Sequence, residues 1–93
     1  MHKYYEEAAH IVRVLTECGM PLNWAFPVHY LLLAVANELE MWVRNNPSHA
    51  LAGARLVDIL SAGQVDDTRR PRLNAIAGTL VGDFLLVRAT RPS

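Results

Sequence analysis

The sequence predicts an all-α protein: a single domain over residues 1–93, built as an antiparallel bundle of about four helices. Two observations predict this fold. Hydrophobic residues recur at helical spacing in three of four segments, the third segment having no single narrow apolar face, and glycine or proline separates the segments. The connections between the segments are short, which favours antiparallel neighbours in a bundle.

The first helix is expected over roughly residues 3–18, where apolar residues share one face. Gly19 supplies the left-handed stop. Residues 20–27 form an apolar loop in which two prolines forbid helix. Because loops seldom carry so much apolar mass without burying it, we expect Trp24 and Phe26 to cover the end of the bundle.

The second helix is expected over roughly 28–45 and is apolar around most of its circumference, so it should be central. The third helix is expected over roughly 47–62, with Asn46 as its N-cap and Pro47 in its first turn. Gly63 ends it, and a polar loop follows.

The fourth helix is expected from Pro71 to about Ala89 and is apolar on two sides. One side is the predicted core stripe of Leu73, Ile76, Leu80, Phe84 and Val87. The other side carries Ala75, Gly78, Gly82, Leu85, Leu86 and Ala89. A glycine inside a helix costs about 1 kcal/mol relative to alanine, and close helix approach is the usual compensation. We therefore predict a homodimer or partner interface on this second side, with a fourth helix buried on both sides within one chain as the alternative.

Composition narrows the function classes. The chain is 52% hydrophobic and 19% charged, which is apolar for so small a domain and points to a protein partner or a homodimer. Formal net charge is zero, so bulk electrostatics do not favour nucleic acid. The cluster Arg69, Arg70 and Arg72 is the candidate phosphate-binding site, although Asp66 and Asp67 beside it are typical of a solvated loop.

Catalytic and metal-binding motifs are absent from the sequence. It contains no phosphate-binding glycine loop, no His-Glu-x-x-His and no Cys-x-x-Cys, and its lone cysteine, Cys18, reads as a core residue. We expect no metal and no cofactor. The amino terminus does not resemble a signal peptide and no apolar run is long enough to span a membrane, so we expect a cytoplasmic protein, bacterial or phage in the style of its sequence.

One short motif resembles a known family. Arg44, Asn45 and His49 have the spacing of the Arg-x4–6-His signature of HEPN-domain ribonucleases. The resemblance implies that Arg44 and His49 bind and activate an RNA phosphate across a dimer, without metal. A longer resemblance covers about residues 4–62 and is similar to the first three helices of HEPN-like domains. In that alignment His49 opens the third helix and the last helix has no histidine, which implies a shortened, non-catalytic member.

Three functions follow as expectations. The leading one is a non-catalytic, regulatory or protein-interaction module that acts through an apolar surface, as a homodimer. The second is a HEPN-type metal-independent ribonuclease of the toxin or defence type that uses Arg44, Asn45 and His49. The third is a small nucleic-acid-binding regulator that uses the arginine cluster.

Overall fold

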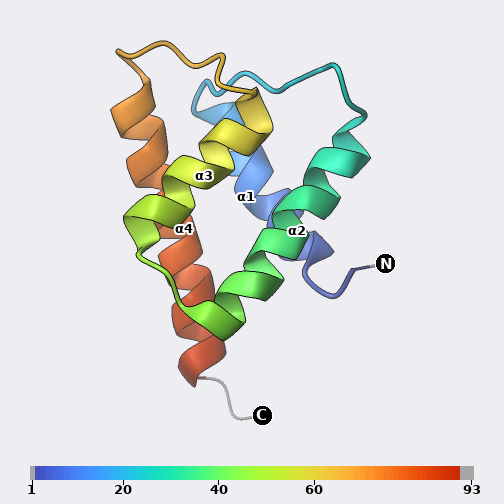
Figure 1. Ribbon diagram of the computed structural model, residues 1–93, viewed down its shortest axis with the longest axis vertical. Helices are drawn as coiled ribbons and strands as arrows, with labels where there is room; N and C mark the ends of the chain where they lie inside the picture. Colours follow the sequence, from blue (N-terminus) through green and yellow to red (C-terminus); the bar gives the residue numbers. More distant parts are fainter. Residues whose placement is uncertain (1, 91–93) are drawn as a thin grey trace.

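A computed structural model describes residues 2–90, with side chains through Arg88, and confirms the all-α bundle (Figure 1). Four helices follow one another: α1 (Tyr5–Glu17), α2 (Val28–Asn45), α3 (His49–Ser61) and α4 (Arg70–Thr90). The predicted bounds of the second helix are matched, and those of the others differ by one or two residues at each end. Pro27 and the Asn46-Pro47 pair explain this agreement, because proline sets where a helix starts or ends.

The core forms where apolar faces of the four helices meet. In α1 the buried residues Ala8, Ile11, Val12 and Leu15 have the spacing of one helical face. α4 packs most extensively against α3, and α1 packs against α2. The largest hydrophobic side chains that are fully buried are Leu15, Leu39, Leu56, Leu60 and Leu73, drawn from every helix.

The face of α4 that meets the core differs from the predicted stripe. Leu73, Ala77, Val81, Phe84 and Leu85 are buried. Ile76 and Leu80 are partly buried against the core, whereas Val87 is 48% exposed. Relative to the predicted stripe, the buried face of α4 is rotated towards its small residues. The reason is that α3 approaches α4 closely.

The close contact between α3 and α4 is made at glycines. A Cβ placed on Gly53 would lie 2.4 Å from the backbone nitrogen of Gly78, and one placed on Gly78 would lie 2.9 Å from the carbonyl oxygen of His49. Real Cβ atoms do not approach backbone so closely. These two glycines thus fix the distance between the two helices.

The turn between α2 and α3 corrects one predicted role. Asn46 adopts a left-handed conformation (φ 45°) and donates its N–H to the carbonyl of Trp42, so it closes α2 at its C-terminal end. Ser48, not Asn46, precedes the first residue of α3. Asparagine tolerates positive φ better than other residues with a side chain, which suits it to this position.

Candidate functional site: interaction surfaces

The predicted interface on α4 lies partly inside the chain. Gly78 is buried under the backbone of His49, and a Cβ on Gly82 would meet the ring of His49 at 2.7 Å. Leu85 is buried, whereas Ala75 and Leu86 are exposed and the side chain of Ala89 lies outside the described ones. The glycines already provide the close helix approach that motivated the prediction, and the helix that approaches is α3 of the same chain. The face is therefore covered within one chain at Gly78 and Leu85, and it stays exposed at Ala75 and Leu86.

The motif Arg44, Asn45 and His49 spans a break between two helices. Arg44 and Asn45 belong to the last turn of α2, and His49 is the first residue of α3. The backbone between them includes the left-handed Asn46. The His49 ring lies against Gly82 of α4, so this ring is directed at a helix of its own bundle.

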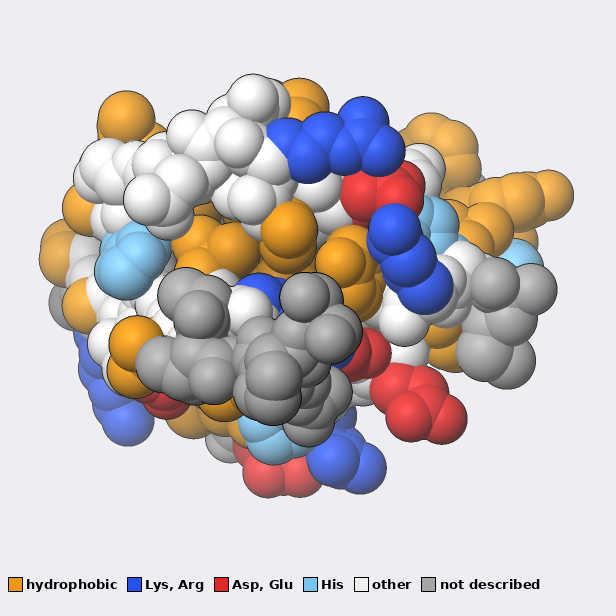
Figure 2. Space-filling view, turned by 90° about the horizontal axis from the view of Figure 1, so that it is seen from below, with side chains coloured by type: hydrophobic (Ala, Val, Ile, Leu, Met, Phe, Trp, Pro, Cys, Tyr) orange, Lys and Arg blue, Asp and Glu red, His pale blue; other side chains and the backbone are white. Residues whose placement is uncertain are grey.

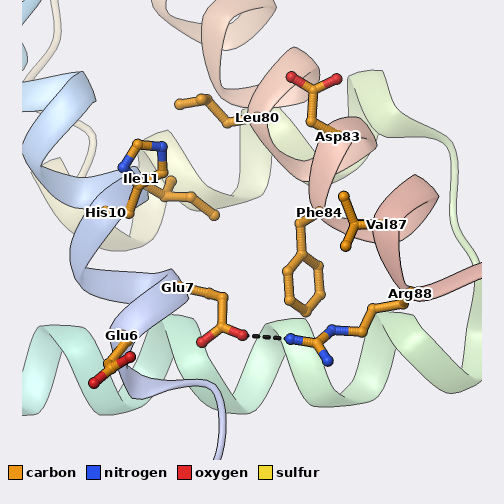
Figure 3. A pocket seen from close by; sticks show the side chains of 9 residues that line it. All are labelled: Glu6, Glu7, His10, Ile11, Leu80, Asp83, Phe84, Val87 and Arg88. Atoms are coloured by element: carbon orange, nitrogen blue, oxygen red, sulfur yellow. Dashed lines mark hydrogen bonds and ion pairs between the residues drawn. The ribbon is translucent and has the colours of Figure 1, made fainter. Parts of the chain in front are cut away.

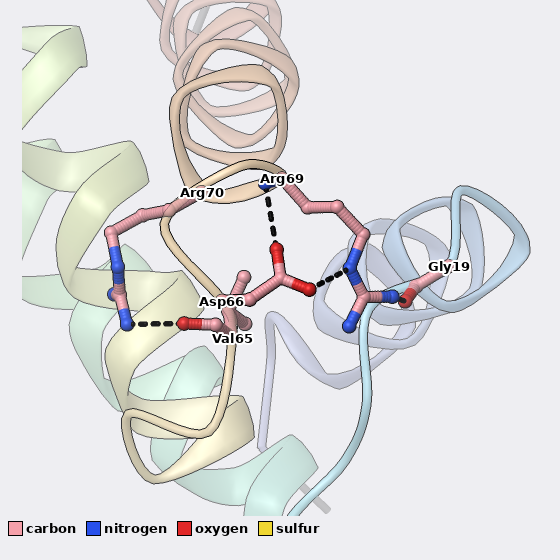
Figure 4. A network of polar contacts seen from close by, with 5 residues as sticks. All are labelled: Gly19, Val65, Asp66, Arg69 and Arg70. Carbon is pink, nitrogen blue, oxygen red and sulfur yellow. Dashed lines mark hydrogen bonds and ion pairs between the residues drawn. The ribbon is translucent and has the colours of Figure 1, made fainter.

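Two of the three clustered arginines hold the loop before α4 (Figure 4). Arg69 donates through Nε to Asp66 at 3.1 Å and through a terminal nitrogen to the carbonyl of Gly19 at 2.9 Å. Arg70 donates to Asp58 and to the carbonyls of Gly63 and Val65. These bonds tie the loop to α1 and α3.

Arg72 differs from its two neighbours. It is exposed, and no hydrogen bond or ion pair of its side chain is found among the described residues. A single unbonded arginine next to two arginines that already bond within the chain is a weak phosphate site, because affinity for nucleic acid grows with the number of neutralised phosphates.

Three aromatic side chains are exposed on and after the loop between α1 and α2. Trp24 is 75% exposed, Phe26 55% and Tyr30 61%. We refer to these three residues as the aromatic surface. Trp24 and Phe26 do not cover the bundle as expected; Met20 and Leu22, earlier in the same loop, are the residues that are buried in the core. The N–H of Asn23 then donates to the carbonyl of Leu60 at 2.7 Å and fixes the loop just before Trp24.

A shallow apolar groove of about 300 Å³ adjoins the aromatic surface. Phe26 and Tyr30 line it together with Asn23, Leu31, Ala34 and Ile59, so every lining residue is uncharged. The sequence shows that the loop is apolar but predicts that Trp24 and Phe26 cover the end of the bundle. No periodicity distinguishes a buried from an exposed aromatic residue in an irregular loop.

A second, larger groove of about 440 Å³ lies between α1 and α4 (Figure 3). We refer to it as the α1/α4 groove. Its lining residues are Glu6, Glu7, His10, Ile11, Leu80, Asp83, Phe84, Val87 and Arg88. Glu7 and Arg88 form an ion pair within it, and the Arg88 guanidinium also lies over the rings of Tyr4 and Phe84, 5.1 and 5.2 Å from their centroids. Sequence reasoning missed this site, since its residues come from helices some seventy positions apart.

Other charged groups serve the packing of the helices. Glu38 on α2 accepts a hydrogen bond from Nε of Arg55 on α3 at 2.9 Å and forms an ion pair with its Nη2 at 2.8 Å. This hydrogen bond and the charge of Glu38 raise the pKa of Arg55. Glu40 lies 3.2 Å from Lys3, whose hydrogen bond holds the pKa of the Glu40 carboxyl below its usual range. The two glutamates therefore serve different faces of α2, as their spacing predicts.

Hydrophobic exposure is not confined to one end of the molecule. Seen from below, hydrophobic side chains reach the surface at several points beside charged ones (Figure 2). Across residues 2–90, no cluster of three or more His, Cys, Asp or Glu side chains could hold a metal ion. In the same range no helix has the length and hydropathy needed to cross a membrane. Cys18 is a half-buried free thiol packed against the core.

Comparison with family models, curated proteins and solved structures finds no match to this chain.

Proposed function

We propose that the protein is a non-catalytic, regulatory or interaction module that binds protein through the aromatic surface and assembles as a homodimer. The observation that carries the proposal is the exposure of Trp24, Phe26 and Tyr30 beside an uncharged groove. Tryptophan and tyrosine dominate the binding energy of protein interfaces, because they bury large areas in few rotamers. Exposed apolar side chains of this size on a small monomer favour association.

The absence of charge in the groove supports a second copy of the chain as the partner. A two-fold contact sets a surface against its own copy, so a charged group near the two-fold axis meets a like charge. The groove lining carries none. The aromatic surface is thus compatible with its own copy, and an isologous dimer is the simplest closed assembly that buries it.

The two alternatives from the sequence have less support. For nucleic acid, Arg69 and Arg70 already bond within the chain, which leaves Arg72 as the cation of the cluster whose side chain has no bond among the described residues. For a ribonuclease, the motif crosses a break between α2 and α3, and the His49 ring lies against Gly82. Neither alternative gains an observation that favours it over the interaction module.

Sedimentation equilibrium of paired variants tests the proposal. The wild type should sediment as a dimer at high concentration, and the double substitution Trp24→Ser with Phe26→Ser should sediment as a monomer with its helical circular dichroism retained. Leu51→Ser is the matched control, because Leu51 is 70% exposed on α3, outside the aromatic surface. A wild type that stays monomeric at the highest attainable concentration contradicts the homodimer. Equal weakening by the Leu51 control contradicts the assignment of the surface.

A further inference from the structure

We propose that the α1/α4 groove binds an amphipathic helix of a partner protein that carries lysine or arginine along the flank of its apolar face. This groove is separate from the aromatic surface, and the proposal does not rest on that surface. It combines three features of the groove: an apolar floor, an uncompensated acidic rim and an arginine that is held in place by the chain itself.

The floor of the groove is apolar and belongs to the packed core. Ile11 and Phe84 are buried, and Leu80 is partly buried against the core. Leu80 and Phe84 are one helical turn apart on α4, and they face Ile11 of α1 across the groove (Figure 3). A cleft between two helices with apolar side chains at such spacing suits the apolar face of a third helix.

The rim of the groove is acidic. Glu6 and Asp83 are exposed on α1 and α4, and within residues 2–90 neither side chain has an ion pair. Glu7 is neutralised by Arg88. With histidine counted as neutral, the lining therefore carries two uncompensated carboxylates, one on each side of the floor. Charge complementarity then selects a partner with cations on both flanks of its apolar face.

Arg88 does not supply the missing positive charge. Its guanidinium bonds to Glu7 and lies over the rings of Tyr4 and Phe84, so moving it to the rim would break the ion pair and two cation–π contacts. The same contacts hold Phe84 and Glu7 in fixed positions. The groove is thereby preorganised, which lowers the entropy cost of binding.

The size of the groove suits a short helical segment. Its volume of about 440 Å³ accommodates a few side chains rather than a whole domain. A partner helix would place two or three apolar residues on the floor and extend beyond the groove in both directions. The affinity of the groove for such a helix should accordingly be modest. It should fall with added salt, because the ion pairs between the partner and the acidic rim are exposed.

Two labelled peptides of matched design serve as probes. Each has about 18 residues, or five helical turns, and the same leucine face. One carries lysine on its flanks and the other glutamate. In fluorescence anisotropy the lysine peptide should bind the wild-type protein and the glutamate peptide should not. Added salt should weaken the binding of the lysine peptide.

Charge-reversed variants locate the binding. Glu6→Lys with Asp83→Lys should weaken the lysine peptide about tenfold or more, because two attractive exposed pairs become repulsive. Glu17→Lys with Asp67→Lys is the matched control: it changes net charge equally at two exposed positions outside the groove and should leave affinity within about twofold. Trp24→Ser should also leave affinity unchanged, which separates this proposal from the aromatic surface.

Three results would overturn the proposal. The first is equal binding of the two peptides, and the second is equal weakening by the groove and control variants, which would mean general charge attraction. The third is loss of peptide binding in Trp24→Ser, which would place the peptide on the aromatic surface. Glu6 and Asp83 are exposed, so the charge-reversed protein should fold, and circular dichroism verifies this for each variant.

Discussion

Gly53 of α3 lies so close to Gly78 of α4 that a Cβ on Gly53 would come within 2.4 Å of the Gly78 backbone nitrogen. The same Cβ would also lie 2.5 Å from the carbonyl oxygen of Asn74. Backbone atoms cannot rotate away as a side chain does, so the two helices would have to separate. This contact accounts for glycine at both positions and explains why α3 and α4 form the most extensive helix pair of the bundle.

We therefore expect Gly53→Ala to destabilise the fold by about 3 kcal/mol through overpacking. The sign of this change is informative, because alanine in place of glycine at an open position of a helix would stabilise the fold by about 1 kcal/mol. Urea unfolding followed by circular dichroism measures the change. Gly63→Ala is the comparison: Gly63 has positive φ but no neighbour within 4 Å of the added Cβ, so a loss of only about 1 kcal/mol is expected. A Gly53→Ala protein more stable than wild type contradicts the close contact.

Gly82→Ala should behave differently from Gly53→Ala. The added Cβ meets the side chain of His49, at 2.7 Å from Nδ1, and that ring can turn aside. Stability should stay within about 1 kcal/mol of wild type, since the helix propensity of alanine offsets the repacking. In a His49→Ala background the same substitution should be stabilising by about 1 kcal/mol. Loss of stability in both backgrounds would mean that backbone, not the His49 ring, limits the space at Gly82.

The bonds around Asp66 predict a pH dependence. The backbone N–H and side chain of Arg69 hold the pKa of the Asp66 carboxyl below its usual range. A lowered folded-state pKa stabilises the fold above the ordinary aspartate value of about 3.9, and this stabilisation disappears as pH falls through the folded-state pKa. Asp66→Asn should therefore lower the urea midpoint at about pH 7 and lose most of this effect at about pH 2. Asp67→Asn is the control and should change the midpoint little. A difference between wild type and Asp66→Asn that grows on acidification would contradict this account.

The non-catalytic assignment predicts no metal-independent cleavage of RNA. Purified protein incubated with single-stranded and structured RNA in the presence of EDTA should leave both substrates intact on a gel. Arg44→Ala and His49→Ala should then be indistinguishable from wild type. Cleavage that either substitution abolishes would support the ribonuclease alternative and contradict the interaction module.

The sequence predicts where the helices of this chain begin and end better than it predicts which face of each helix is buried. Pro27 and Asn46-Pro47 mark the ends of α2 because proline restricts the backbone locally. Which side of α4 is buried does not follow from the local sequence. Apolar residues lie on two sides of this helix, and its close contact with α3 at Gly53 and Gly78 covers the side that carries the small residues.

The candidate sites were harder to predict for the same reason. Trp24 and Phe26 are as apolar as core residues, yet both are exposed, whereas Met20 and Leu22 of the same loop are buried. The α1/α4 groove joins Glu6 to Asp83, and no sequence spacing connects residues so far apart. Such sites emerge from tertiary packing.

The emission of Trp24 tests the central claim most directly, because this residue is 75% exposed whereas Trp42 is 5% exposed. In a Trp42→Phe protein Trp24 is the sole tryptophan. If the aromatic surface pairs two copies, its emission should shift to shorter wavelength as protein concentration rises, and Phe26→Ser should displace that shift to higher concentration. Emission that remains that of water-exposed tryptophan at every concentration, in a protein that is folded by circular dichroism, would contradict the homodimer built on this surface.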